Sequence, residues 1–317
     1  MLYTDRQQYP LDYFPRRVKW SPDGSSVVAL SYDDDVSIFE FDNQYDISLW
    51  FQAKGTVTDV CWYPLMMKEN QTSCAFAMIV PLYPIELVDS NDGHVRAIYR
   101  CQYGGDQPAS LACLGFYGSY IIAGGTKTMF FADITRPGRI SDTPYHCSGS
   151  ILSLATHCDS SIIAAGTSTG SLRVIDGRSF QEAFNESYHI HGVDSIIWSN
   201  NILFSSSRLS DTIIGLDIRN PDTVYMKLST FRSSSRKISM SATNNIICVG
   251  NEGEEAHMYD ISGNLLSSIG SGPTPIIEVS CYESIVAASG SFQVIENDDI
   301  PEFKPVLKEL GFYKKPN

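Results

Sequence analysis

The sequence predicts an all-β protein folded as a seven-bladed β-propeller. The chain consists of short apolar runs separated by Gly, Ser, Asn and Asp, and few segments show the 3.6-residue period of an amphipathic helix. One pattern, an apolar residue followed by aspartate, also returns at a nearly constant interval. A length of 317 residues is typical of two average domains, but propellers of this size form one. We therefore expect a single propeller domain over residues 1–317.

The repeat is marked by an aspartate at the end of one strand in each unit. Six such aspartates lie 47, 44, 43, 41 and 43 residues apart, at Asp42, Asp89, Asp133, Asp176, Asp217 and Asp260. A repeat of roughly 40–45 residues is typical of a WD40 blade, although the usual Trp-Asp pair has lost its tryptophan here. The spacing therefore predicts blades of the WD40 type.

Each unit begins with an apolar strand. These strands are expected to start near Val18, Val57, Leu111, Ile151, Val193, Ile238 and Ile276. Seven such blades close a ring without a long exposed sheet edge. The second unit carries an insertion at residues 65–73, and the seventh lacks its terminal aspartate and ends in residues 292–299. Its outer strand can come from either terminus, and the residues leave that choice open.

Composition limits the classes of function. The chain has 23 basic and 36 acidic residues and a formal net charge of −13, so any nucleic-acid contact needs a local basic patch. No signal peptide or apolar run of roughly 18 residues is found, so we expect no membrane association. The eight cysteines form no Cys-x-x-Cys pair and lie mostly in apolar strands, which favours reduced thiols in an intracellular protein.

Several motifs occur in an order that resembles one family. They are VKWSPDGS, CWYPLM, PIELVDSNDGHVRA, ITRPGR and SSRLSDTIIGLDIRNP. This order is similar to that of the telomerase Cajal body protein family, whose members are WD40-repeat scaffold proteins of box H/ACA small Cajal body RNAs and telomerase RNA. The resemblance covers roughly residues 16–295 and predicts a compact, divergent member.

The resemblance implies a non-enzymatic protein without cofactors that binds small nuclear RNA and aids the localisation or assembly of the ribonucleoprotein. It also implies that the partners are proteins of the ribonucleoprotein and, during folding, a chaperonin, as for other WD40 propellers. The protein is expected to be a monomer. It is expected in Cajal-type nuclear bodies, with a part of the protein in the cytoplasm. The alternative is a protein–protein scaffold in splicing or chromatin complexes without direct RNA binding. A net charge of −13 is unremarkable for such a scaffold.

Basic residues gather in a few expected loops. Strands alternate in direction within a blade, so the loops that join second to third strands, and fourth strands to the next blade, emerge at one end of the ring. The candidate RNA-binding residues in these loops are Lys127, Arg208, Arg232, Arg236 and Lys237. Residues 208–237 carry six basic and three acidic side chains, a local net charge of +3. Arginines can contact phosphates and stack on unpaired bases, but solvated or ion-paired loop residues would show the same pattern.

Other residues complete the predicted surface. Tyr32, Phe231 and Phe292 are candidate platforms for base stacking at the same end. Two acidic segments, residues 33–35 and 252–255, also lie there, so RNA would favour the third to fifth blades and the adjoining loop. Arg136 and Arg139 lie in the turn of the motif DITRPGR at the opposite end and are secondary contact candidates.

The remaining polar residues are expected to be structural. The six strand-end aspartates should accept hydrogen bonds from turn N–H groups, and His191 should bind Asp217. Three His and Cys groupings suggest a metal, at residues 146–147, 157–158 and 189–191. Adjacent strand residues point to opposite faces, so we expect no zinc site. The sequence contains no Gly-x-Ser-x-Gly nucleophile elbow. It also contains no Gly-rich phosphate-binding loop between a strand and a helix, so the common sequence motifs of hydrolases and nucleotide-binding proteins are not found.

Overall fold

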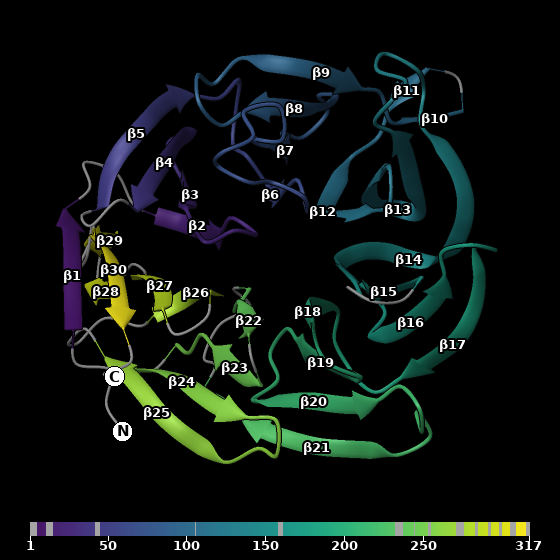
Figure 1. Cartoon of the computed structure of the whole chain (residues 1–317). Coiled ribbons are helices and arrows are strands. Elements are labelled where there is room, and N and C mark those ends of the chain that lie inside the picture. The colour runs from purple at the N-terminus through teal and green to yellow at the C-terminus, as the bar shows by residue number, and fades with distance from the viewer. Residues whose placement is uncertain are drawn as a thin grey trace.

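The computed structural model describes residues 5–314 apart from residues 11–14, 42–44, 105, 158–160, 232–236, 244, 253–254, 271–275, 283–284, 291–292, 298–299 and 305–308. Within these ranges the regular elements are β-strands, arranged as a β-propeller around a central axis (Figure 1). None of the described segments forms a helix with the length and apolar character that crossing a membrane would require.

Five of the sheets are four-stranded antiparallel blades, and four of these use consecutive strands. The first contains β2 (Pro15–Trp20), β3 (Ser26–Ser31), β4 (Asp35–Phe41) and β5 (Tyr45–Gln52). The second contains β6 (Asp59–Trp62), β7 (Ala75–Ile79), β8 (Ile85–Asp89) and β9 (Val95–Tyr99). The next two contain β18 (Val193–Ser199), β19 (Ile202–Ser207), β20 (Thr212–Asp217) and β21 (Val224–Ser229), and then β22 (Met240–Thr243), β23 (Ile246–Val249), β24 (Glu255–Asp260) and β25 (Leu265–Gly270). A small hairpin pairs β10 (Gln102–Tyr103) with β11 (Gln107–Pro108).

A six-stranded sheet stands where two of the expected blades would be. It contains β12 (Leu111–Tyr117), β13 (Tyr120–Asp133), β14 (Asp142–Thr156), β15 (Ile162–Thr167), β16 (Ser171–Asp176) and β17 (Gln181–Ser187). The prediction of seven separate blades is therefore wrong, since the described residues form five four-stranded blades and this larger sheet. The reason is that β14 runs unbroken through an expected unit boundary. It pairs with β13 up to Ser150 and with β15 from Ile151 onward.

The fifth four-stranded blade joins the two ends of the chain. Its strand order is β26 (Ile276–Tyr282), β27 (Ile285–Gly290), β30 (Glu309–Lys314) and β1 (Asp5–Pro10). The choice that the sequence left open is therefore resolved in favour of both termini, with β1 as the outer strand. The expected third strand of this unit instead forms a separate hairpin of β28 (Gln293–Asn297) with β29 (Ile300–Lys304). Pairing β1 with β30 ties the beginning of the ring to its end.

The inner strands β2, β6, β12, β14, β18, β22 and β26 surround the middle of the ring, and each contacts the next (Figure 1). Neighbouring inner strands do not pair with each other through their backbones, because they belong to different sheets or to separate parts of one sheet. The hydrogen bonds between them are made by side chains. The indole of Trp62 donates to the carbonyl of Lys19 at 3.0 Å, and the hydroxyl of Ser153 donates to the carbonyl of Val193 at 2.9 Å. These bonds satisfy backbone groups at strand edges that no ladder covers.

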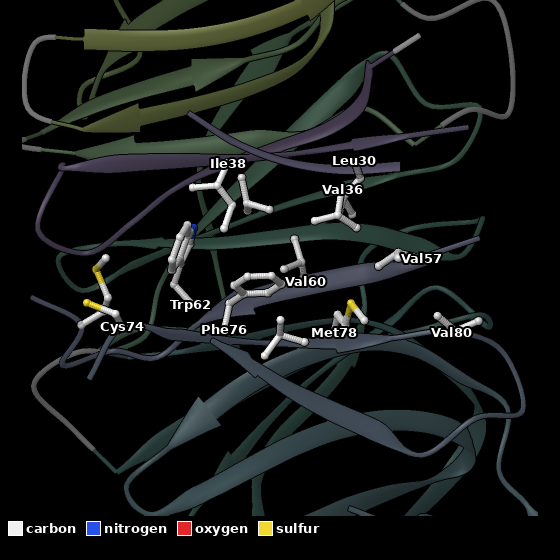
Figure 2. Packing of buried hydrophobic residues seen from close by; sticks show 13 residues of the cluster. Leu30, Val36, Ile38, Val57, Val60, Trp62, Cys74, Phe76, Met78 and Val80 are labelled. Atoms are coloured by element: carbon white, nitrogen blue, oxygen red, sulfur yellow. The ribbon is translucent and has the colours of Figure 1, made fainter. Parts of the chain in front are cut away.

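The hydrophobic core lies between successive sheets. Figure 2 shows Leu30, Val36 and Ile38 of the first blade packed against Trp62 and Phe76 of the second. The ring centroids of the two aromatic residues are 5.5 Å apart in an edge-to-face arrangement. Because a blade is covered on both faces, middle strands such as β3 and β7 are buried at every residue. This explains the continuous apolar runs in the sequence.

Candidate nucleic-acid interface

The ring has two ends with different loops. At one end, which we call the start face, the inner strands begin and the second and third strands of each blade are joined. At the opposite end, called the turn face, the third and fourth strands are joined after the strand-end aspartates. These definitions follow from the antiparallel pairing within each sheet.

The predicted RNA-binding residues that the structure describes are all on the start face. Lys127 is exposed within β13, where its backbone has a φ of 57° and the ladder to β14 shifts register. Arg208 is exposed directly after β19, and its backbone N–H donates to the carbonyl of Gly192 at 3.0 Å. Lys237 is half-buried just before β22. Arg232, Arg236 and Phe292 lie outside the described residues.

Lys237 lines the central cavity together with two other cations. The cavity has a volume of about 420 Å³ and is lined mainly by inner strands. Arg17 and Lys19 of β2 contact the carboxylate of Asp59 in the neighbouring inner strand β6, where the lysine nitrogen lies 3.1 Å from Oδ1. The backbone N–H of Leu114 in β12 donates to Oδ2 at 2.9 Å. One carboxylate thus connects three inner strands.

The charge of Asp59 is strongly favoured in the folded protein. Burial alone would raise the pKa of this carboxyl, but Lys19, Arg17 and Lys237 together with the Leu114 N–H hold it well below its ordinary value. Part of the positive charge of Lys237 is therefore balanced inside the protein. The sequence signal for this cluster was present but not recognised: alternating Arg17 and Lys19 place two cations on one face of a short strand.

The described aromatic candidates also lie on the start face. Tyr32 is exposed, and the guanidinium carbon of Arg16 lies 5.6 Å from its ring centroid. Phe231 is exposed, and its backbone N–H is held by Asn251 Oδ1 at 2.9 Å. Tyr83, in the loop between β7 and β8, is a third exposed aromatic residue that the sequence reasoning missed. Its position between Pro81 and Pro84 was the available signal, because proline favours turns.

The turn with Arg136 and Arg139 lies on the turn face and is fastened to the neighbouring blade. Backbone N–H groups of Gly138 and Ser141 donate to carbonyls of residues 98 and 100, both at 2.8 Å. The hydroxyl of Tyr99 donates to the carbonyl of Ile134 at 3.0 Å. The turn therefore covers the end of β9, while both arginine residues remain exposed.

The strand-end aspartates organise the turns on this face. Five lie in the described residues, and each accepts a hydrogen bond from the backbone N–H two residues later at 2.8–3.0 Å, at Asp89, Asp133, Asp176, Asp217 and Asp260. Asp42 lies outside the described residues. At Asp217 the side chain and N–H of Arg219 lower the carboxyl pKa to about 2. The aspartates thus act on their own turns.

The structural histidine of the fifth unit is His189 and not His191. His191 is exposed, and Arg219 binds both oxygens of its expected partner Asp217. His189 is buried, and its Nε2 lies 2.9 Å from the hydroxyl of Ser205. Burial lowers the pKa of His189 to about 4, so the ring is neutral at physiological pH. The sequence places both histidines two residues apart, and only packing distinguishes them.

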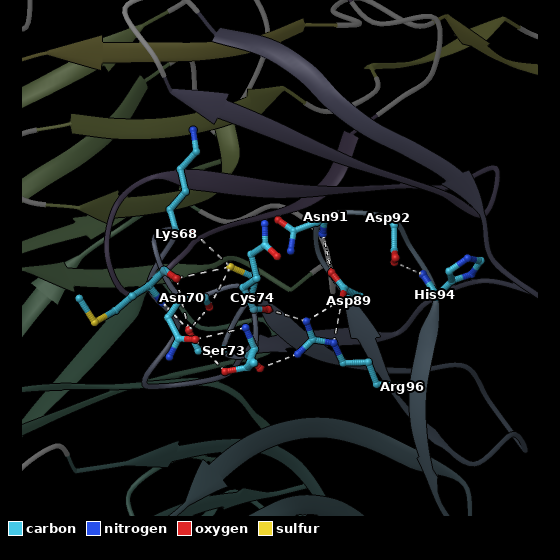
Figure 3. A network of polar contacts seen from close by, with 12 residues as sticks. Lys68, Asn70, Ser73, Cys74, Asp89, Asn91, Asp92, His94 and Arg96 are labelled. Atoms are coloured by element: carbon cyan, nitrogen blue, oxygen red, sulfur yellow. Dashed lines mark hydrogen bonds and ion pairs between the residues drawn. The ribbon is translucent and has the colours of Figure 1, made fainter.

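The insertion of the second unit is held by a polar network (Figure 3). The guanidinium of Arg96 binds Asp89 and the carbonyls of Gln71 and Thr72 at 2.6–2.9 Å. The thiol of Cys74 lies beneath the loop, 3.4 Å from the carbonyl of Met67, and burial raises its pKa. Across the described residues, no group of three or more His, Cys, Asp or Glu side chains is arranged to hold a metal ion.

Comparison with known proteins finds several similar sequences. No family model matches the chain. Telomerase Cajal body protein 1 of Mesocricetus auratus is 23% identical over 284 residues, covering 82% of this chain and 53% of that protein. The Rattus norvegicus protein of the same name is 24% identical over 274 residues, covering 79% and 52%. Guanine nucleotide-binding protein negative regulator 1 of Schizosaccharomyces pombe is 27% identical over 140 residues, covering 39% and 35%.

The two mammalian proteins match most of this chain. The chain in turn spans about half the length of these curated relatives. Identity of 22–24% over about four fifths of this chain recurs in four mammalian proteins of that name. Together with the propeller arrangement, these matches show that the chain is similar to telomerase Cajal body protein 1 over most of its length, as a divergent relative would be.

Proposed function

We propose that this chain is a non-enzymatic propeller scaffold that binds a small nuclear RNA and aids the assembly or localisation of its ribonucleoprotein in the nucleus. The observation that carries the proposal is the match to proteins named telomerase Cajal body protein 1 over about four fifths of the chain. The RNA class is box H/ACA small Cajal body RNA or telomerase RNA, with ribonucleoprotein proteins as partners. Residues 1–317 act as one domain in this proposal.

The start face is the surface we assign to the RNA. Lys127 and Arg208 are exposed there, and Lys237 lies at the edge of the central cavity. The loop between β21 and β22 adds Arg232 and Arg236 in the sequence. Basic side chains can neutralise RNA phosphates, while exposed aromatic rings such as Phe231 can stack on unpaired bases at about 1–3 kcal/mol per base. Such local contacts are needed because the net charge of −13 repels RNA elsewhere.

Crosslinking followed by RNA sequencing tests the proposal. The intact protein should enrich small nuclear RNAs of the box H/ACA type, and a variant with Lys127→Glu and Arg208→Glu should lose that enrichment while remaining folded. Recovery of background RNA alone by the intact protein would refute RNA binding.

A protein–protein scaffold without RNA binding is the second candidate. Aliphatic side chains on the start face favour it, since Ile190 is 92% exposed and Leu209 is also exposed beside Arg208. Exposed aliphatic groups are more typical of protein interfaces than of RNA interfaces. The same crosslinking experiment separates the two candidates, because this scaffold would recover only background RNA.

A further inference from the structure

Leu82 is held in an unusual backbone conformation on the start face. Among the turns joining second and third strands, left-handed residues include Asp34, Leu82, Gly170 and Leu209. Glycine adopts this conformation without cost and aspartate tolerates it, but leucine is disfavoured there by its Cβ. Leu82 has a φ of 66° and is 64% exposed, so little packing within the chain offsets the cost. Such an exposed, strained apolar residue indicates a contact outside the chain.

Leu82 belongs to a larger exposed surface. Tyr83 is its neighbour and is 47% exposed, and Tyr32 is exposed in the adjacent turn of the first blade. The residues flanking both turns, Leu30 and Val36 on one side and Val80 on the other, belong to a single buried cluster (Figure 2). The two turns therefore emerge from one packed layer. We call Tyr32, Asp33, Asp34, Asp35, Trp50, Leu82 and Tyr83 the acidic aromatic surface.

This surface carries an excess of negative charge. Asp33, Asp34 and Asp35 are consecutive, and burial together with the charges of the other two raises the pKa of Asp35. Trp50, which is 57% exposed, lies beside Asp35 as a hydrogen-bond donor. Crowded carboxylates are relieved by a nearby cation.

Among the residues that the structure describes, Arg16 and Lys54 are cations near this surface, and both have partners within the protein. Arg16 covers the ring of Tyr32 and donates to the carbonyl of Val57 at 3.1 Å. Lys54 is paired with the buried carboxylate of Glu86. The carboxylates of residues 33–35 are therefore in excess, and they would repel RNA phosphates. Complementary charge on a partner must be positive.

We propose that the acidic aromatic surface binds a basic protein segment that carries an apolar anchor. The apolar side chain of the segment packs on Leu82 and Tyr83, and its arginine or lysine side chains contact the carboxylates and the exposed aromatic rings. Both contact types occur in recognition of basic peptides. The site lies on blades other than those assigned to RNA, so it goes beyond the proposed function and does not depend on it.

The test uses the full chain and a short synthetic peptide in which arginine and leucine alternate, with binding followed by fluorescence anisotropy. Leu82→Gly should weaken binding about tenfold by removing the apolar contact, while thermal stability is kept or raised because glycine relieves the left-handed strain. Asp33→Asn combined with Asp35→Asn should weaken binding and flatten its salt dependence. The matched control is Leu209→Gly, which makes the same change in the corresponding turn of another blade and should leave binding unchanged.

Three results would overturn the proposal. They are equal binding by the wild type and by Leu82→Gly, equal loss in Leu209→Gly, and equal affinity for a peptide in which glutamate replaces arginine. Binding of a single-stranded RNA oligomer to the same variants is measured as a further comparison. If Leu82→Gly weakens RNA binding and not peptide binding, the surface belongs to the RNA site and the peptide proposal fails. Loss of RNA binding in Lys127→Glu with Arg208→Glu, with peptide binding intact, would support two separate sites.

Discussion

At the scale of single residues, Asp59 connects three inner strands beside the central cavity. Its carboxylate contacts Arg17 and Lys19 of one blade and the backbone of Leu114 in the six-stranded sheet. Arg17 is almost fully buried, so its charge depends on this carboxylate for compensation. Removing one member of a buried ion pair leaves the other without a counter-charge in a region of low polarity.

We therefore expect Asp59→Asn to destabilise the protein by about 3–5 kcal/mol, because Arg17 loses its partner in a buried position. The free energy of unfolding, measured by denaturant titration, checks this. The matched control Asp33→Asn removes an exposed carboxylate and should change the free energy by less than about 0.5 kcal/mol. Equal effects of the two substitutions would contradict the role of Asp59 as a link between strands.

The difference in unfolding free energy between the wild type and Asp59→Asn depends on pH, because the pKa of Asp59 is lowered in the folded protein. A depressed pKa in the folded state adds stability above the ordinary value of 3.8, and that stability is lost as the pH falls below it. The stability difference between wild type and Asp59→Asn should therefore be constant from pH 7 to pH 5 and shrink in more acidic solution. Parallel denaturant titrations at several pH values measure it, and a difference that shrinks already near pH 6 would disagree.

At the scale of elements, strands that are distant in sequence decide how the ring closes. β1 pairs antiparallel with β30, from Asp5 opposite Lys314 to Pro10 opposite Glu309. β30 in turn pairs with β27. Without β1, the edge of β30 would present unpaired N–H and C=O groups to other molecules.

Deletion of residues 1–14 should lower the melting temperature by roughly 5 °C or more and promote association through the free edge of β30. Calorimetry and light scattering measure the two effects. A synthetic peptide of residues 1–12, added in trans, should restore part of the lost stability, and a scrambled peptide should not. An unchanged melting temperature in the deleted protein would show that β1 does not close the ring.

At the scale of the whole molecule, local and global charge oppose each other. The chain carries a net charge of −13, whereas residues 208–237 carry +3. The ring keeps the loops of different blades at fixed positions. Lys127 and Arg208 belong to other sheets than the acidic residues 33–35, whereas the backbone N–H of Glu252 donates to the carbonyl of Phe231 at 3.0 Å. Long-range repulsion and local attraction respond differently to salt.

We expect the double change of Lys127→Glu and Arg208→Glu to weaken RNA binding and to flatten its salt dependence. Loss of two phosphate contacts should reduce the slope of log affinity against log salt by about 1.4 for single-stranded RNA. Filter binding or anisotropy over a range of salt concentrations measures the slope. The opposite-face pair Arg136→Glu with Arg139→Glu is the control, and an equal loss there would contradict the assignment of RNA to the start face.

The sequence by itself determined the all-β class, the spacing of the repeat and the resemblance to telomerase Cajal body proteins, because these depend on local patterns. The strand-end aspartates could be found because each of the five that the structure describes accepts a hydrogen bond from a backbone N–H only two residues away. The motif DITRPGR likewise identified a turn, although its attachment to β9 could not be read from it. Features that depend on residues close together in the sequence could therefore be predicted from the sequence alone.

Only the tertiary structure decided the features that depend on distant neighbours. The continuous β14, the closing pair of β1 with β30, and the link from Asp59 to strands about 40 and 55 residues away all require knowing which segments meet. The same holds for the choice of His189 over His191, which depends on burial beside Ser205. Local residue patterns specify strands and turns, but partners are selected by packing and hydrogen bonding across the whole ring, and a linear pattern does not encode that selection directly.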